Sequence, residues 1–220
     1  MKKAIDSEVA ASTDPERPYH HGNLVEALIA ATVEMIEDRG VENVSVREVA
    51  KRAGVSPGAP FRHFRSKTAL LTAVAEQAMD RLVQAVKDAQ SALGDAADPI
   101  ARFEAIGQGY LEWAIANPTH FQVISSRTLI DFHASQTMRA HNDAIRVQMV
   151  HLLSLARAQG RIPAEVDFDC LVLSSRAFVY GLARMVIDGH FPEWHTSSPP
   201  AMAARQALSL FIGKMTSRHD

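Results

Sequence analysis

The part of the chain that most constrains its fold begins at Ser45 and ends at Phe64, because its sequence predicts two short helices joined by a tight turn. Ser45 and Glu48 have the spacing of a capping box, in which each side chain bonds a backbone N–H at the start of a helix. Gly54 stands where that helix must end in a left-handed residue. Ser56 is expected to cap the second helix, with a proline beside it at the first helical position. Such a pair is a helix-turn-helix, whose second helix enters the major groove of DNA.

The predicted DNA-binding surface combines the outward side of the second helix with nearby caps and cations. We expect Phe61 and Phe64 to anchor the second helix in the core, which leaves its other side chains facing outward. The predicted DNA-binding residues are Ser45, Arg47, Ser56, Pro57, Gly58, Ala59, Arg62, His63 and Lys67.

Local charge favours this interpretation. Between Asn43 and Lys67 there are six basic residues and one acid, a net charge of +5, although the whole chain has a net charge of −2. A positive patch on a nearly neutral protein is typical of a restricted phosphate-binding surface. The alternative is a solvated helix pair with ordinary surface lysines and arginines.

Six short motifs follow one another between Tyr19 and Leu82: Tyr-His-His-Gly-Asn-Leu, Glu-Asp-Arg-Gly, Val-Arg-Glu-Val-Ala, Ala-Gly-Val-Ser-Pro-Gly, Phe-Arg-His-Phe and Ser-Lys-Thr-Ala-Leu-Leu. With these motifs, the N-terminal third resembles the TetR family of bacterial transcriptional regulators. The region around Trp113 to Phe121 is similar to the C-terminal domain type called WHG. The resemblance implies a DNA-binding regulator that dimerises through a four-helix interface.

Two positions depart from the family pattern on the DNA side. Phe61 stands where these regulators often have a tyrosine that reaches a phosphate, and Ala59 replaces a frequent threonine. Both departures remove a hydroxyl, so we expect DNA affinity to depend more strongly on the basic side chains.

The chain as a whole predicts an all-α fold in three parts. Residues 1–18 are polar and lack apolar periodicity, which indicates a flexible arm; 19–82 form the helix-turn-helix domain, and 83–220 form a C-terminal regulatory and dimerisation domain. Outside the helix-turn-helix at about 45–64, we expect helices at about 23–39, 67–93, 99–116, 118–129, 134–159, 167–189 and 199–216.

The last two predicted helices have apolar residues on all sides. A helix that is apolar all round must be buried all round, which in a domain of this size indicates a two-fold dimer. Deep burial within one monomer is the alternative. The predicted interface residues are Phe178, Leu182, Met185, Leu208 and Phe211.

A cavity inside the C-terminal helices is the default site for a small-molecule effector. The candidate lining residues are Phe103, Tyr110, Trp113, His120, Phe121, Met138, Met149, Arg176 and Tyr180, each of which is more commonly a core residue. Arg176 needs an acceptor in its apolar helix: an acid across the dimer, a backbone carbonyl or an anionic ligand. Of these, a structural partner is favoured.

An enzyme is not expected. The run from Gly54 to Gly58 matches the nucleophile-elbow pattern G-x-S-x-G, but the residue after the serine is Pro57, which has no N–H for an oxyanion. The sequence predicts no catalytic residue, no metal site and no cofactor, since no array of histidines or cysteines has ligand spacing. No run is expected to reach the length of a membrane span, no secretory signal is recognised, and the single cysteine, Cys170, fits a reducing cytoplasm.

The sequence therefore predicts a cytoplasmic, ligand-responsive repressor that acts as a homodimer on a pseudo-palindromic operator. Its expected partners are double-stranded DNA, a second copy of itself and a small-molecule effector of unknown identity, with no membrane contact. The alternative is a DNA-binding regulator without a small-molecule ligand, controlled by a protein partner or by its abundance. A fully packed C-terminal bundle would favour that alternative.

Overall fold

The computed structural model describes residues 24–94 and 96–216, and every regular element in these ranges is helical, which confirms the all-α fold class. The predicted arm at 1–18 and the predicted helix start at Asn23 lie outside the described residues. The α-helices are α1 (Leu24–Arg39), α2 (Val46–Arg52), α3 (Lys67–Ser91), α4 (Pro99–Ala116), α5 (Pro118–Ser125), α6 (Gln136–Ala158), α7 (Phe168–Ile187) and α8 (Pro200–Met215). The 3₁₀ turns are η1 (Val41–Asn43), η2 (Pro60–Arg62) and η3 (Phe191–Trp194).

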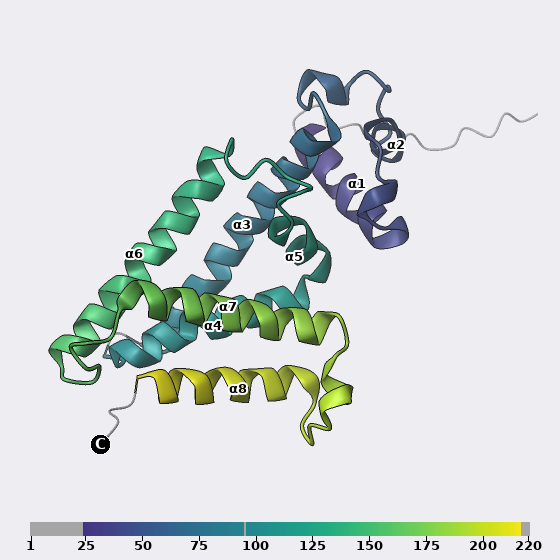
Figure 1. Cartoon of the computed structure of the whole chain (residues 1–220). Helices are drawn as coiled ribbons and strands as arrows, with labels where there is room; N and C mark the ends of the chain where they lie inside the picture. Colours follow the sequence, from purple (N-terminus) through teal and green to yellow (C-terminus); the bar gives the residue numbers. More distant parts are fainter. Residues whose placement is uncertain (1–23, 95, 217–220) are drawn as a thin grey trace, which may run out of the picture.

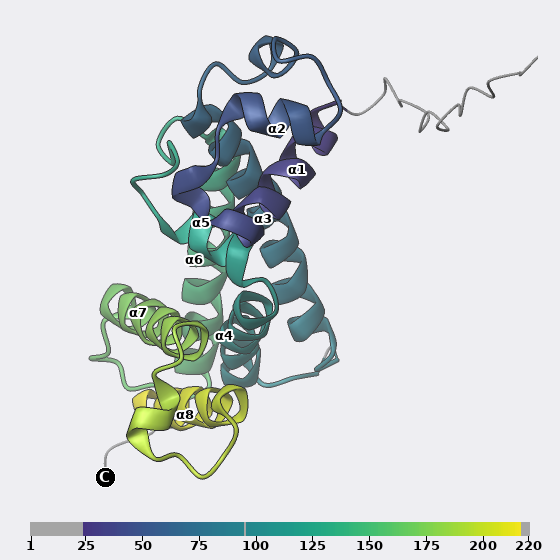
Figure 2. The same cartoon turned by 90° about the vertical axis from the view of Figure 1, so that its right-hand side faces the viewer.

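The molecule has a small N-terminal head and a larger helical body (Figures 1 and 2). The head contains α1 and α2, and α3 leads from it into the body, where it packs mainly against α4. Helices α7 and α8 lie side by side at the far end of the body, away from the head (Figure 1). Among the body helices, α5 contacts α1 of the head as well as α3 and α4.

The first helix of the helix-turn-helix ends as its sequence predicts, but its capping box is only half formed, because the Glu48 carboxylate accepts from the Ser45 hydroxyl and not from a backbone N–H. Ser45 Oγ accepts a hydrogen bond from the Glu48 N–H at 3.2 Å, while its hydroxyl donates to Glu48 Oε2 at 3.0 Å. The backbone bonds from Gly54 N to Lys51 O (3.2 Å) and from Val55 N to Ala50 O (2.9 Å) form a Schellman motif. Gly54 has φ +69°, so the predicted left-handed end of the helix is confirmed.

The prediction of a regular second helix from Ser56 is wrong. Successive turns run from Ser56 to Phe64, and within them only η2 is helical. No side chain caps η2, so Ser56 is not a cap. The reason is Pro60, which has no N–H to bond the Ser56 carbonyl and therefore prevents an α-helical ladder from starting there. Ala59 N bonds the Ser56 carbonyl instead, at 3.0 Å.

The predicted anchors of this segment are also partly wrong. Phe64 is buried as expected, but Phe61 is 48% exposed, and Pro60 takes the inward position. Phe64 is three positions after Phe61, a spacing that puts two rings on one face of an α-helix, but the turns here are not α-helical and the two rings do not share one face.

The most extensive helix–helix contact in the body is the close packing of α3 on α4. Ser66 caps α3, and Asp98 caps α4 through bonds from the backbone N–H of Ile100 and of Ala101. A Cβ built on Gly109 would lie 3.0 Å from the Cα of Val86, a tight contact, so the glycine allows the two helices to approach this closely without strain. Helix α4 has the predicted bounds of 99–116.

Helix α5 ends four residues before its predicted end at 129. The Ser125 hydroxyl donates to the Phe121 carbonyl at 2.6 Å, and Ser126 adopts an extended conformation that stops the helix. A serine hydroxyl competes with the backbone N–H for helix carbonyls in this way.

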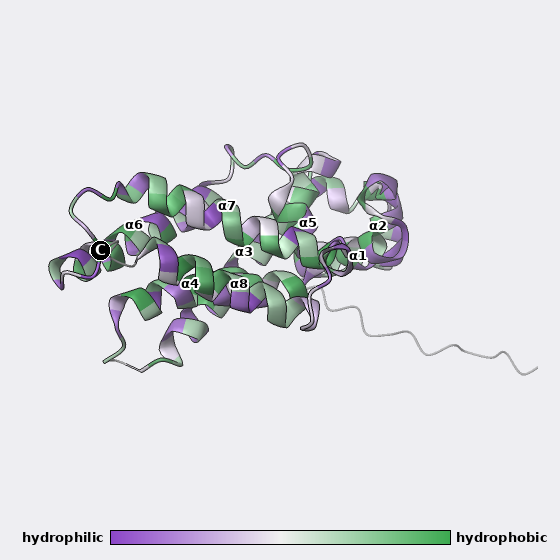
Figure 3. Ribbon diagram, turned by 60° about the horizontal axis from the view of Figure 1, so that its bottom comes forward, coloured by the Kyte–Doolittle hydropathy of each residue, from purple (hydrophilic) through white to green (hydrophobic). Residues whose placement is uncertain are grey.

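Helices α7 and α8 differ from the sequence expectation in two respects. By length and composition α7 could cross a membrane, with a mean hydropathy of 1.5 in its most apolar window, which corrects the expectation that no run reaches that length. Core helices of soluble proteins meet the same criterion, and α7 packs against α4, α6 and α8. Helix α8 is not apolar all round: it has polar as well as apolar turns (Figure 3), and Arg205 on it lies 3.6 Å from Glu112 of α4.

Candidate functional site

The outer surface of the head presents basic side chains without acidic partners. Arg47, Lys51, Arg62 and Arg65 are exposed, and no ion pair involves them within the described residues. Arg52, by contrast, is paired with Asp38 and Glu34 of α1. Four of the six basic side chains between Asn43 and Lys67 are therefore exposed and outside any ion pair within the described residues.

The other predicted DNA-binding residues lie around the same turn. Ser56, Pro57, Gly58 and His63 are exposed, Ala59 is half-buried, and Ser45 is occupied as the cap of α2. The Lys67 ammonium donates to the Glu42 carbonyl at 2.9 Å, so this lysine ties the start of α3 to η1. Lys67 thus has a structural bond that the sequence did not indicate.

A cavity of about 420 Å³ opens into the body between α3, α4, α6 and α7. Its apolar wall includes Leu82 and Val86 of α3, Phe103 and Ile106 of α4, and Met149 of α6. Helix α8 contributes two aliphatic side chains at one end, and α5 contributes to the wall as well. Because the bundle is not fully packed, the structure provides the space that a small-molecule effector requires.

Five of the nine predicted lining residues do border this cavity: Phe103, Tyr110, Met149, Arg176 and Tyr180. The other four do not line it. Trp113, Phe121 and Met138 are buried core residues, as the more common role of such side chains would suggest. His120 lies against α3 instead, with its Nε2 3.5 Å from Arg81 Nη1, and burial followed by the Arg81 charge lowers its pKa.

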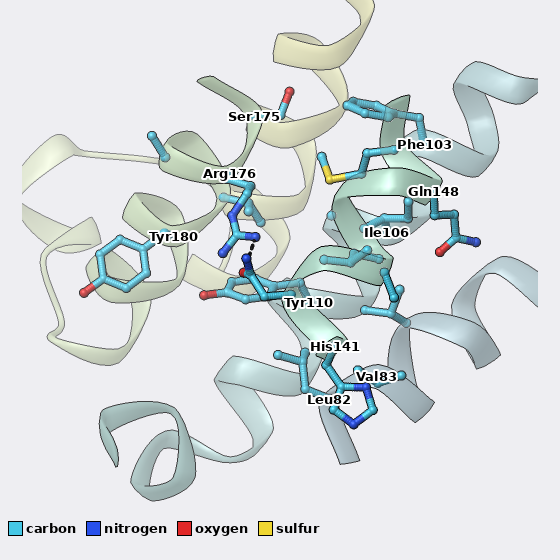
Figure 4. Close-up of a pocket in the computed structure, with 18 of the residues that line it drawn as sticks. Leu82, Val83, Phe103, Ile106, Tyr110, His141, Gln148, Ser175, Arg176 and Tyr180 are labelled. Carbon is cyan, nitrogen blue, oxygen red and sulfur yellow. Dashed lines mark hydrogen bonds between the residues drawn. The ribbon is translucent and has the colours of Figure 1, made fainter. Parts of the chain in front are cut away.

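Arg176 is one of the polar residues that border the cavity (Figure 4). Its guanidinium donates to Asn142 Oδ1 at 2.9 Å, so its acceptor in the chain is a neutral side chain of α6. Burial raises the pKa of the Tyr110 hydroxyl, an effect that the Arg176 charge opposes, so Tyr110 remains a neutral donor. Arg127 also borders the cavity, where it donates to the Ile124 carbonyl at 3.0 Å.

Three further polar residues of the cavity lining are not predicted from the sequence: Arg127, Asn142 and Ser175. Arg127 follows the end of α5 and Asn142 lies on α6, and only the fold of the chain brings them near Arg176. The hydroxyl of Ser175 is buried in the cavity wall and has no hydrogen-bond partner. No local pattern in the sequence marks these three residues.

The predicted dimer residues fall into two groups. Leu182 and Leu208 are already buried within the chain, which corrects their assignment to an interface. Phe178 and Phe211 stack with ring centroids 4.3 Å apart and remain half-buried, as does Met185. Leu210 is 64% exposed, and a Cβ on Gly181 would meet nothing within 4 Å. An apolar surface therefore remains uncovered on α7 and α8.

A helix-turn-helix head with outward cations, joined through one helix to a separate body with a cavity, defines a two-domain DNA-binding regulator. Sequence comparison agrees: residues 28–74 match the family of bacterial regulatory proteins called tetR, and 103–211 match a tetracyclin repressor-like C-terminal domain. The chain belongs to the TetR family of bacterial transcriptional regulators. The more specific WHG assignment stays a prediction.

Solved structures show the same fold. A protein of unknown function from a Rhodococcus species is 28% identical, with a TM-score of 0.74 over 92% of this chain and 100% of its own. The TetR family transcriptional regulator PfmR from Thermus thermophilus is 19% identical, with a TM-score of 0.64 over 87% of this chain and 99% of its own. The fatty acid degradation regulator FadR from Bacillus halodurans is 18% identical, with a TM-score of 0.63 over 91% of this chain and 100% of its own. No curated protein sequence matches the chain significantly.

Proposed function

We propose that this protein is a cytoplasmic, ligand-responsive repressor that binds a pseudo-palindromic operator as a homodimer and performs no catalysis. The observation that carries the proposal is the placement of α3. Its 25 residues extend over about 38 Å: Lys67 lies at the DNA side, and Leu82 and Val86, about 23 and 28 Å further along, lie in the cavity wall. A ligand that repacks the wall would therefore act on the helix that holds the head.

The proposed mechanism is a population shift between two head positions. A ligand must bind the DNA-incompetent conformer more tightly than the competent one, because equal affinity for both shifts nothing. A second connection runs through α5, which borders the cavity at Ile124 and contacts α1 of the head. Either connection would change the spacing of two heads in a dimer.

The proposed DNA contacts divide into base-reading and phosphate-holding groups. The exposed turn from Ser56 to Arg62 would enter the major groove, while Arg47, Lys51 and Arg65 would lie near the phosphates. Phe61 offers a phosphate no hydroxyl, so electrostatic contacts would supply most of the affinity.

DNA selected from random sequence gives the operator with which to test these contacts. Arg62→Ala should weaken operator binding by roughly 1–3 kcal/mol if Arg62 contacts a base. Arg52→Ala is the matched control, because it removes the same charge at a position already paired with Asp38 and Glu34. Equal losses of affinity in both folded variants would show that only the total charge matters and would contradict the assigned surface.

The proposed dimer joins α7 and α8 of two chains around a two-fold axis. Only 33% of the apolar window of α7 is buried within one chain, which leaves a surface for a second copy. Phe211→Glu should give monomers in sedimentation velocity, because a carboxylate would be buried against the partner. Val147→Glu is the control, since Val147 is 64% exposed on α6. A folded Phe211→Glu protein that remains dimeric would contradict this interface.

The proposed cytoplasmic location is based on the free thiol of Cys170 and not on a targeting signal. Cys170 is an exposed free thiol, which persists in a reducing compartment. DNA-binding regulators of this family are soluble, and their operators lie in the same compartment.

A further inference from the structure

A group of polar side chains borders a cavity whose lining is otherwise mostly apolar. Arg176 donates to Asn142 Oδ1, its charge acts on the pKa of Arg127 and of Tyr110, and Figure 4 shows its guanidinium near the Tyr110 ring. The rest of the lining is mainly aliphatic and aromatic side chains, among them Ile106. This combination matches a molecule with one charged group and a compact apolar part.

The charge balance of the described lining is positive. Lys87, Arg127 and Arg176 face it with one acid, Glu104, and His141 is paired with Asp80 at 2.7 Å. Glu104 is engaged elsewhere: Ser209 donates to its Oε1 at 2.5 Å, as does Gln108 at 3.3 Å. No acid of the lining therefore neutralises the arginines.

Arg176 and Arg127 are exposed side chains that border the cavity, and no ion pair involves either of them within the described residues. Arg176 has only a neutral acceptor, Asn142, and Arg127 has the Ile124 carbonyl and the Phe132 ring, 4.0 Å from its guanidinium carbon. Burial, and then the Arg176 charge, lower the pKa of Arg127, so the two guanidiniums repel each other. A carboxylate between them would remove this repulsion and accept charge-assisted hydrogen bonds.

We infer that the cavity binds an amphiphilic organic anion, with its carboxylate at Arg176 and Arg127 and its apolar part against Ile106 and the surrounding aliphatic wall. This inference rests on the proposed ligand response and adds the chemical class of the ligand. If each non-hydrogen atom of the ligand takes about as much space as a water molecule, about 30 Å³, the cavity of about 420 Å³ holds on the order of 14 such atoms. A ligand of that size is a small organic acid.

One further group marks the interior as a binding site. The Ser175 hydroxyl is 5% exposed and lacks a partner, and a buried hydroxyl without a partner is unfavourable. A polar atom on the body of the natural ligand would bond it. Decanoate, which has no such atom, tests the anionic end alone.

The test measures binding of decanoate, below its micelle concentration, and of neutral 1-decanol to the full chain by calorimetry. Wild-type protein should bind decanoate more tightly than decanol. Arg176→Gln should weaken decanoate binding roughly 10- to 100-fold, and should change decanol binding by less than about twofold because the apolar contacts remain. Arg184→Gln is the matched control on the same helix, since Arg184 is paired with Asp188 at 2.8 Å and does not line the cavity.

Three results would overturn the inference: no decanoate binding, decanol binding as tight as decanoate binding, or equal effects of Arg176→Gln and Arg184→Gln. Ile106→Trp, which fills the cavity, should abolish binding of both probes, and retained binding would place the site elsewhere. Melting curves verify that each variant is folded.

A parallel operator-binding assay separates this inference from the proposed function. Operator release by decanol but not by decanoate would overturn the anionic class and keep the ligand response. Decanoate binding through Arg176 with unchanged operator affinity would support the anion site and contradict the proposed regulation.

Discussion

The turn of the helix-turn-helix depends on one backbone conformation, and Gly54→Ala tests it. Gly54 has φ +69°, and a Cβ there would meet nothing within 4 Å, so the substitution causes no clash with other residues. Its cost comes from the backbone alone, at roughly 1–2 kcal/mol for a non-glycine residue in the left-handed region. Loss of freedom in the unfolded chain offsets about 0.4–1 kcal/mol of this.

The net expectation is a loss of about 1 kcal/mol in the free energy of unfolding. For a chain of this size that corresponds to a fall of about 2–4 °C in Tm. Gly58→Ala is the control, because Gly58 also has open space around a built Cβ but does not have a positive φ. Its stability should be unchanged or higher by about 0.4–1 kcal/mol.

Urea unfolding followed by far-UV circular dichroism measures both variants under the same conditions. Gly54→Ala should be the less stable of the pair. If the two variants have the same midpoint and slope, the left-handed residue does not contribute to ending α2, and the account of this turn is wrong.

Two other substitutions test the body of the protein. Gly109→Ala should destabilise the chain by about 1–3 kcal/mol in urea unfolding, because the new Cβ would press on the backbone of Val86 at 3.0 Å. An unchanged unfolding midpoint would show that α3 and α4 can move apart at no cost to make room for the methyl group. Burial and the neighbouring Arg81 lower the pKa of His120, so the folded state favours the neutral ring. Stability should therefore fall as the pH drops below the unfolded-state pKa of about 6.5 toward the lowered folded-state pKa, and His120→Gln should flatten this dependence; an identical pH profile would refute the role of His120.

Local chemistry explains which parts of the fold could be predicted from the sequence. Ser45, Gly54 and Asp98 set the bounds of α2 and α4 through bonds within a few residues, and such bonds follow from spacing alone. Pro60 also acts locally, yet the prediction of a regular helix considered only the favourable Pro57. One proline inside the segment was enough to replace the expected helix with turns.

The cavity depends on contacts between distant residues and could be predicted only in part. Arg176 could be predicted because a charge in an apolar helix is conspicuous, but its neighbours Arg127 and Asn142 come from other segments. Trp113 has the same helical spacing as a lining residue and is buried core instead. Helical periodicity shows that a residue faces inward, but it does not show whether the space there is filled.

Footprinting on DNA selected from random sequence, with sedimentation of the same complex, tests the central claim most directly. The account predicts a pseudo-palindrome bound by a dimer, with half-sites about one helical turn apart (about 34–36 Å) or a multiple of it. Affinity should fall steeply as salt rises, because outward cations supply much of the binding. A single asymmetric site protected by a monomer, or affinity that is indifferent to salt, would contradict it.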